Sequence, residues 1–418
     1  MKQKMQKLSE KFLKKIRIME YKRTKRKYKS LEIKTNKKSD LTQTSISNSI
    51  KVRNPGIDLG RIISMYGIII HHILLWGRGI SHFRQYKELH YLDTLINWHV
   101  NDFIFISGYV GYKTTKYSNL LYLWFCTLFY SLGIIKYFSI YKPNLYKKQI
   151  DFNDFFPVIN YQYWYFTAYF GMYLFLPVIN KGLENINKSQ LKVAILSFII
   201  IFSILKDYIN PKLDSFQIVN GYSVLWFIIL YITGAYFGKF KKNNNVIKKV
   251  IKIVIYILIF YYSGYLCINL PDYRINYINN NKKQILKTKF ILFLKSIFKA
   301  RFSSIAMILQ SISSILFLTN INYNKYIAKI ISFIGPLTFG VYLIHDNSVI
   351  RGVIMRDLLK NYPRRLPLNT VYKIIFLKGL KIFGICSIID YLRNILFRIL
   401  QIRKICILFE KLIFILFG

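Results

Sequence analysis

Long runs of apolar and aromatic residues, separated by short polar segments, fill the chain from residue 57 onward. A helix rises about 1.5 Å per residue and the hydrocarbon core of a bilayer is about 30 Å thick, so about 20 such residues can cross it. The pattern therefore predicts an all-α polytopic membrane protein with about ten transmembrane helices. We expect these helices near 57–76, 95–112, 118–141, 163–180, 191–209, 222–239, 247–270, 302–319, 330–350 and 371–400.

Lysines and arginines in the connecting loops indicate the orientation of the spans. Cytoplasmic loops carry an excess of these residues. The loops at 113–116, 181–188 and 239–249 are basic, whereas the only basic residue of 210–221 is Lys212. With an even number of spans, both termini are then expected in the cytoplasm. The basic loop 271–301 falls outside in this order, so either it lies along the outer leaflet or one span is miscounted.

Charge and composition narrow the choice of partners. The chain has 62 Lys and Arg against 18 Asp and Glu, a formal net charge of +44, and 53% of its residues are hydrophobic. The first 56 residues alone hold eighteen Lys or Arg and four acids. Basic side chains beside an anionic leaflet contribute about 1 kcal/mol each. We therefore expect membrane lipid, and no nucleic acid, as the partner of this charge.

The polar start of the chain is separate from the apolar runs. We predict a basic, largely disordered cytoplasmic arm at 1–53, a membrane domain at 54–400 and a cytoplasmic tail at 401–418. The four cysteines lie singly within apolar runs and form no CxxC pair, so neither a disulfide framework nor a metal site is predicted.

The first predicted helix carries the ionisable residues Asp58, Arg61, His71 and His72. Such residues are expensive inside a membrane and usually functional. Arg61 and His72 are eleven positions apart, which places them about 20° apart around the helix axis and about 16 Å apart along it. A site that uses both must hold a long ligand, with an anionic group at Arg61 and a reacting group at His72. Otherwise Arg61 reaches the inner membrane surface and His72 is a polar packing contact, and His71 is expected to pack beside His72.

Four stretches, in order, resemble the integral-membrane acyltransferase family 3. The Arg-x10-His arrangement of Arg61 and His72 follows an "ID-x-x-R-I-I" opening. Residues 98–109, WHVNDFIFISGY, and 163–180, YWYFTAYFGMYLFLPVIN, are similar to the second-helix pattern and to a helix of members that O-acetylate polysaccharides. Residues 338–345, TFGVYLIH, resemble a helix late in the family's domain. The resemblance covers roughly 54–400.

The resemblance implies an activity and a donor. Family members take an acyl group, usually acetyl, from cytoplasmic coenzyme A and place it on a hydroxyl of a sugar or lipid-linked glycan across the membrane. It therefore implies acetyl-CoA as the acyl donor, Arg61 as a contact of the anionic coenzyme and His72 as the residue that acts in transfer. Where many members carry Arg-x-x-Arg at the start of the third helix, this chain has Lys113 and Lys116. Lysine binds phosphate as a point charge and not as a planar fork.

Acyl transfer to an alcohol needs a base for the hydroxyl proton and donors for the developing oxyanion. His72 is the expected base, since histidine has an ordinary pKa of about 6.5. The chain contains no G-x-S-x-G nucleophile signature, which favours direct transfer. His345 is expected to serve as an oxyanion donor, a contact of the acceptor or a structural partner. Trp164, Tyr165 and Tyr169 are expected to stack on sugar rings at the outer mouth or to belong to an interfacial aromatic belt.

The leading interpretation is a membrane O-acyltransferase in the cell membrane, acting on a cell-envelope polysaccharide or a lipid-linked glycan. A second interpretation is a transporter or flippase of a glycan-lipid or small anion, based on the basic cavity that Arg61 and the loop lysines imply. The lack of an internal sequence repeat weakens it. A third is a membrane scaffold whose basic arm binds anionic lipid.

Overall fold

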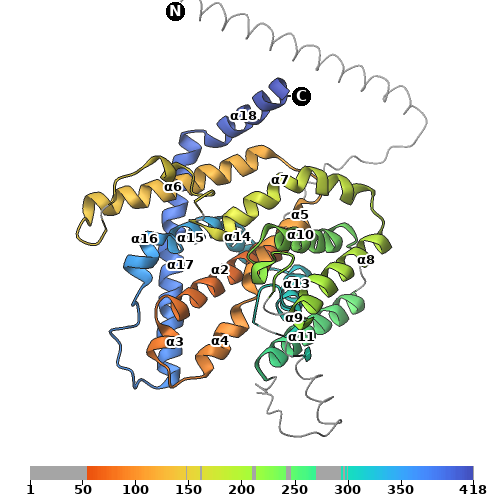
Figure 1. The fold of residues 1–418 in the computed structure, drawn as a ribbon, viewed down its shortest axis with the longest axis horizontal. Helices are drawn as coiled ribbons and strands as arrows, with labels where there is room; N and C mark the ends of the chain where they lie inside the picture. Colours follow the sequence, from red (N-terminus) through yellow and green to blue (C-terminus); the bar gives the residue numbers. More distant parts are fainter. Residues whose placement is uncertain are drawn as a thin grey trace, which may run out of the picture. The chain divides into compact units, whose positions relative to one another are not determined.

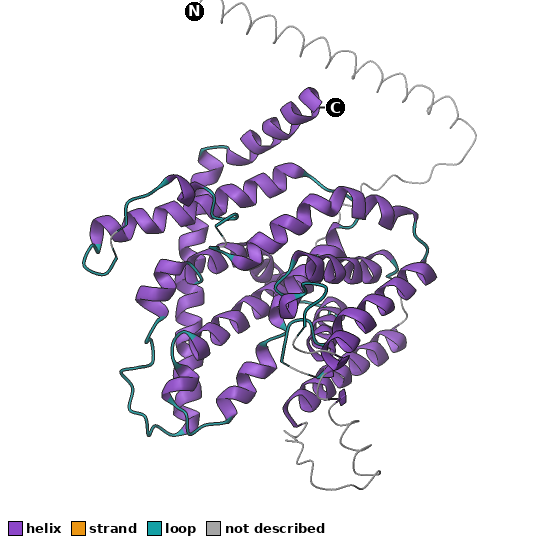
Figure 2. Cartoon of the chain, in the orientation of Figure 1, coloured by secondary structure: helices purple, strands orange, loops and turns teal. Residues whose placement is uncertain are grey.

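In the computed structural model, the described residues are 54–146, 148–160, 162–209, 213–241, 246–269 and 300–417, with a few positions between 293 and 298. These residues form helices joined by loops, and no strand occurs among them (Figures 1 and 2). The basic arm predicted at 1–53 and most of the loop 271–301 lie outside the described residues.

Helices occupy each range that was predicted to cross the membrane. The main ones are α2 (Pro55–Leu75), α4 (Glu88–Ile96), α5 (His99–Gly111), α6 (Tyr117–Tyr141), α7 (Trp164–Asn185), α8 (Lys188–Ile199), α10 (Val224–Lys239), α11 (Val246–Asn269), α13 (Ile305–Asn320), α14 (Lys325–Ile334), α15 (Thr338–His345), α17 (Leu368–Ile399) and α18 (Ile402–Phe417).

Five helical stretches among the described residues are long and apolar enough to cross a membrane. They are Pro55–His82, Tyr117–Tyr141, Lys188–Leu205, Ile247–Asn269 and Lys325–His345. Helices α10 and α13 are apolar but shorter. The all-helical fold predicted from the sequence is therefore confirmed, and the chain is an integral membrane protein.

Helix α2 contacts α4, α5, α13, α14, α15 and α17 and so lies at the centre of the bundle (Figure 1). Its start is fixed by Asn54, whose side chain accepts a hydrogen bond from the Gly56 N–H at 2.9 Å, and by Pro55 at the first helical position. The Asn54 amide also donates to the Thr319 carbonyl at 3.0 Å. This hydrogen bond ties the start of α2 to the end of α13.

Two of the predicted spans are not single regular α-helices. Within the helical stretch Lys325–His345, α14 passes through a 3-10 turn at Gly335–Leu337 into α15. Pro336 has no N–H to donate, so the α-helical ladder cannot continue through it. The run 95–112 is likewise divided between α4 and α5. Helix α15 follows the 3-10 turn, ends at His345 and contacts α2.

Glycines let the central helices approach closely. A Cβ on Gly108 of α5 would lie 1.9 Å from the Tyr231 carbonyl oxygen in α10. A Cβ on Gly67 of α2 would lie 1.9 Å from Cδ2 of His99, which is buried at the start of α5. Small residues at such interfaces are what allow membrane helices to pack backbone against backbone.

A buried ion pair links α17 to α6 and α15. Arg393 donates from Nε and Nη2 to Oδ1 of Asp390 at 3.0 and 2.7 Å. The Tyr130 hydroxyl of α6 donates to the same oxygen at 2.8 Å. Asp390 is 0% exposed and Arg393 is 6% exposed. A Cβ on Gly340 of α15 would lie 1.9 Å from this oxygen, so α15 packs directly against the pair.

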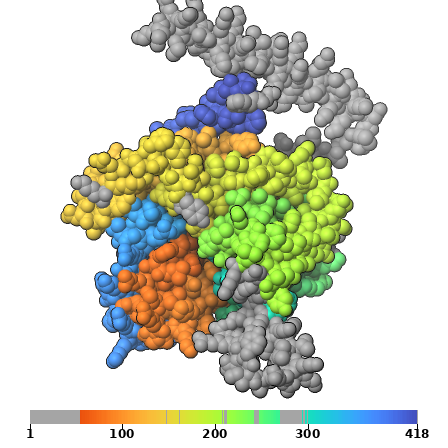
Figure 3. Space-filling model, viewed as in Figure 1, coloured from red at the N-terminus to blue at the C-terminus, as the bar shows by residue number. Residues whose placement is uncertain are grey.

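The predicted tail 401–418 contains helix α18, which packs along α6 (Figure 3). The Tyr117 and Phe414 rings lie 6.2 Å apart between centroids. Arg403 donates to the Asn119 side chain at 3.1 Å. Helix α18 and Arg403 therefore contact α6.

Candidate active site

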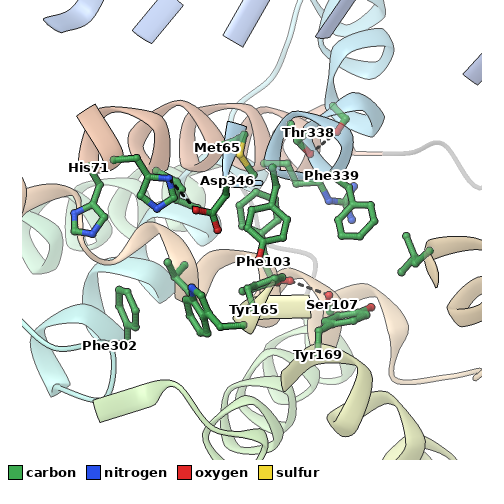
Figure 4. Close-up of a pocket in the computed structure, with 18 of the residues that line it drawn as sticks. Met65, His71, Phe103, Ser107, Tyr165, Tyr169, Phe302, Thr338, Phe339 and Asp346 are labelled. Atoms are coloured by element: carbon green, nitrogen blue, oxygen red, sulfur yellow. Dashed lines mark hydrogen bonds and ion pairs between the residues drawn. The ribbon is translucent and has the colours of Figure 1, made fainter. Parts of the chain in front are cut away.

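A cavity with a volume of about 270 Å³ lies between α2, α5, α7 and the segment 335–346 (Figure 4). Its walls are mostly apolar and aromatic. Helix α2 contributes Arg61, Met65, Ile68, His71 and His72; α5 contributes Val100, Phe103 and Ser107; α7 contributes Trp164, Tyr165 and Tyr169; and the segment 335–346 contributes Gly335, Pro336, Thr338, Phe339, Tyr342 and Asp346.

The structure places Arg61, Met65, Ile68 and His72 along one wall of this cavity, the face that helical spacing defines in the sequence. Asp58 shares that face but is completely buried, and its Oδ1 accepts from Arg61 Nη1 at 2.8 Å. The carboxylate therefore orients the guanidinium without itself lining the cavity. A single elongated cavity thus includes both the cation and the imidazole of the Arg-x10-His arrangement.

The His72 imidazole is hydrogen-bonded to His345. His72 Nδ1 lies 3.1 Å from His345 Nε2, and His345 Nδ1 lies 2.7 Å from the Val341 carbonyl oxygen. A carbonyl only accepts, so in the neutral pair His345 carries its proton on Nδ1 and offers a lone pair at Nε2. His72 then donates from Nδ1, which leaves the lone pair on its own Nε2. This is the protonation state that a general base requires.

His345 is 1% exposed and is not part of the cavity wall, so its position is that of a partner of His72. The next residue, Asp346, does line the cavity, and its Oδ1 lies 3.7 Å from His72 Nδ1. Arg351 donates to the same oxygen at 3.2 Å. Sequence reasoning did not single out Asp346 as a site residue; a carboxylate inside a predicted span was the available signal.

The aromatic residues of α7 lie along the length of the cavity. In Figure 4, His71 and Phe302 lie toward one end, and Tyr169, Ser107 and Phe339 lie toward the other, with Tyr165 between them. Tyr165 and Tyr169 rings are stacked at 6.3 Å between centroids. These two tyrosines therefore line the middle and the far part of the cavity, away from His71.

Trp164 belongs to an aromatic cluster with Tyr222 and Phe302, which also line the cavity. Its ring centroid lies 4.3 Å from that of Tyr222 and 5.9 Å from that of Phe302, with the latter rings nearly parallel at 9°. Tyr222 and Phe302 were missed from the sequence, because each stands alone at the start of a separate predicted span. Only packing brings them to Trp164.

Lys113 and Lys116 do not line this cavity. Both are exposed, and neither forms an ion pair with a residue in the described part of the chain. The Lys116 carbonyl accepts from the Tyr173 hydroxyl at 2.9 Å, which places it one helical turn beyond Tyr169. The two lysines therefore lie past the end of the cavity opposite His71.

Over the residues that the structure describes, no group of three or more His, Cys, Asp or Glu side chains could hold a metal ion. The residues present do fit a long thioester donor: a mostly apolar cavity with a cation near one end and an imidazole acceptor toward the other.

The described residues therefore form an integral membrane helical bundle with a mostly apolar cavity that Arg61, His71 and His72 line. Over residues 54–377 the chain matches the family model described as an acyltransferase domain, and it belongs to acyltransferase family 3. Neither a curated protein nor a solved structure matches the chain.

Proposed function

We propose that the protein is a membrane O-acyltransferase that moves an acetyl group from cytoplasmic acetyl-CoA to a hydroxyl of an extracytoplasmic or lipid-linked glycan of the cell envelope. The observation that carries this proposal is the single cavity that both Arg61 and His72 line. In the orientation expected from the loop charges, both termini are cytoplasmic and Arg61 is near the cytoplasmic surface. Membrane lipid then surrounds the bundle.

His72 is the base of the proposed reaction. Its Nε2 takes the proton of the acceptor hydroxyl as that oxygen attacks the thioester carbon. The carbon–sulfur bond then breaks, and the proton passes from His72 to the leaving thiolate, so that an ester and free coenzyme A result. His345 fixes the tautomer, and Asp346, 3.7 Å from Nδ1, stabilises the imidazolium formed on the way.

In the proposed reaction, the acyl donor is held by cations at the Arg61 end of the cavity, away from His72. Arg61 contacts the anionic part of the coenzyme, and the exposed Lys113 and Lys116 attract the phosphates that remain outside the cavity. The apolar walls exclude water around the thioester, which limits hydrolysis. Tyr165 and Tyr169 lie along the path from Arg61 to His72 and supply part of those walls.

The acceptor approaches from the His71 end. Trp164, with Tyr222 and Phe302, offers aromatic faces close to His72, and such faces suit the apolar side of a sugar ring. Trp164 is therefore the proposed stacking residue for the acceptor, and Tyr165 is the one that meets both substrates.

The proposal is tested with purified protein, acetyl-labelled acetyl-CoA and lipid-linked glycans from cells that lack the protein. His72→Ala is expected to lower kcat by about 10²–10⁴-fold, the contribution of a positioned base. Arg61→Ala is expected to raise the KM for acetyl-CoA at least about tenfold, since a charged hydrogen bond contributes about 1.5–3 kcal/mol.

His82→Ala is the matched control, because the His82 ring contacts the Tyr362 carbonyl at 2.8 Å and does not line the cavity. It should transfer acetyl groups like the wild type. Full activity in His72→Ala would contradict the proposal. So would glycan-lipid movement across vesicles without any acyl donor, which is what the transporter interpretation requires.

A further inference from the structure

His71 is a second imidazole in the cavity wall to which the proposed reaction gives no role. It lies in the same turn of α2 as His72. Their ring centroids are 5.8 Å apart, with an interplanar angle of 45°. Both residues line the cavity. Neighbouring helical positions differ by about 100° around the axis, so each ring has its own partner helix: α15 for His72 and α4 for His71.

The partner of His71 is Asp93 of α4. His71 Nδ1 lies 2.6 Å from Asp93 Oδ1, and the two side chains are 18% and 20% exposed. A carboxylate only accepts, so His71 donates from Nδ1. In the neutral ring, the tautomer that follows has its lone pair on Nε2. Asp93 therefore has the position of an orienting carboxylate, which fixes both the direction and the tautomer of the ring.

Both histidines are oriented through a hydrogen bond at Nδ1, each with a different partner. In each, Nδ1 is taken by a neighbouring helix, and Nε2 is left to accept a hydrogen bond. In Figure 4 the His71 and Phe302 rings lie toward the same end of the cavity, which both residues line. A flat polyol that stacks on the aromatic cluster would therefore present its hydroxyl edge to two imidazoles.

We propose that His71, oriented by Asp93, is a second acceptor-binding residue of this site, beside Trp164: its Nε2 accepts a hydrogen bond from a hydroxyl next to the one that is acylated. Hydrogen bonds of about 2.8 Å allow rings whose centres are 5.8 Å apart to reach hydroxyls on adjacent carbons. The acceptor class is then a sugar or polyol with neighbouring hydroxyls. This inference rests on the proposed function.

The test separates acceptor binding from proton transfer. Donor and acceptor are those used above, acetyl-labelled acetyl-CoA and lipid-linked glycans from cells lacking the protein. His71→Ala is expected to raise the KM for the glycan about tenfold while the KM for acetyl-CoA stays within about twofold. His71→Gln should recover most of the loss, because its Oε1 can accept near the position of Nε2 but cannot take up a proton. Asp93→Asn should raise the glycan KM in the same direction, since its amide can donate to Nδ1 and reverse the tautomer.

Two residues of α4 provide matched controls. His90 and Glu88 are exposed and do not line the cavity, so His90→Gln and Glu88→Gln should leave both KM values unchanged. An unchanged glycan KM in His71→Ala would overturn the inference. A lower kcat in both His71→Ala and His71→Gln, to the same extent, would also overturn it. Such a result would mean that His71 moves a proton.

Failure of the proposed function gives a different result. If wild-type protein transfers no label, or if His72→Ala transfers as well as the wild type, the acyltransferase assignment itself is contradicted and the inference about His71 fails with it. If only the His71 and Asp93 variants behave like the wild type, the assignment stands and the inference alone is wrong.

Discussion

Removing Arg393 is expected to destabilise the bundle strongly. In Arg393→Met the Asp390 carboxylate, 0% exposed, loses the hydrogen bonds from Nε and Nη2 and keeps only the Tyr130 hydroxyl at 2.8 Å. Breaking a buried pair by removing one partner costs about 3–5 kcal/mol, because the remaining charge has no compensation. Since about 1.4 kcal/mol is a factor of ten, the unfolded fraction should rise at least about 100-fold.

The assay is unfolding of purified protein in mixed micelles by titration with a denaturing detergent. The double variant Asp390→Asn with Arg393→Met should recover much of the loss, because no buried charge is left. Lys181→Met is the matched control: Lys181 and Glu184 have the same i,i+3 spacing at 2.9 Å, but their side chains are 76% and 50% exposed. Such a pair contributes about 0.2–1 kcal/mol.

A loss in Arg393→Met that is no larger than in Lys181→Met would refute the reasoning. The lead variant should also lose acetyl transfer, because α15 packs on the ion pair at Gly340 and carries His345 at its end. Transfer that falls without any loss of stability would mean that the pair acts on the site directly and is not a structural clamp.

Two further predictions concern packing and donor binding. Gly67→Ala would place a Cβ 1.9 Å from His99 Cδ2 and is expected to cost about 1–3 kcal/mol in the same unfolding assay; Gly133→Ala, where nothing lies within 4 Å, should cost nothing, and equal losses would contradict this account. Replacing both Lys113 and Lys116 with Ala should raise the KM for acetyl-CoA about fivefold at low salt and less at high salt, with kcat unchanged. A fall in kcat at an unchanged KM would remove both lysines from the donor site.

The part of the site that lies on one helix could be predicted from the sequence. An α-helix has a fixed period, so eleven positions are enough to put Arg61 and His72 on one wall, whatever surrounds them. The partners of the two histidines could not be found in this way. His345 is 273 positions away from His72, and the packing of α15 against α2 brings the two rings together.

Asp93 illustrates a second limit. The run 95–112 has the length and apolar character of one span, and Asp93 lies just outside it. The structure divides this region into α4 and α5, and α4 then packs beside α2 so that Asp93 reaches His71. Hydrophobic periodicity reports where helices form, but the angle between two successive helices depends on packing that no local pattern encodes.

The chain of hydrogen bonds behind His72 ends on the Val341 carbonyl, which is a main-chain atom. Every residue at position 341 has a carbonyl oxygen, so a substitution that keeps the helix also keeps this acceptor. The tautomer of His345 is therefore set by the helix backbone, and a substitution alters the hydrogen bond to His72 Nδ1 through position 345 and not through position 341. At position 345, Gln also carries an acceptor near the place of the His345 Nε2. We therefore expect His345→Gln to be the substitution that best keeps the hydrogen bond to His72 Nδ1.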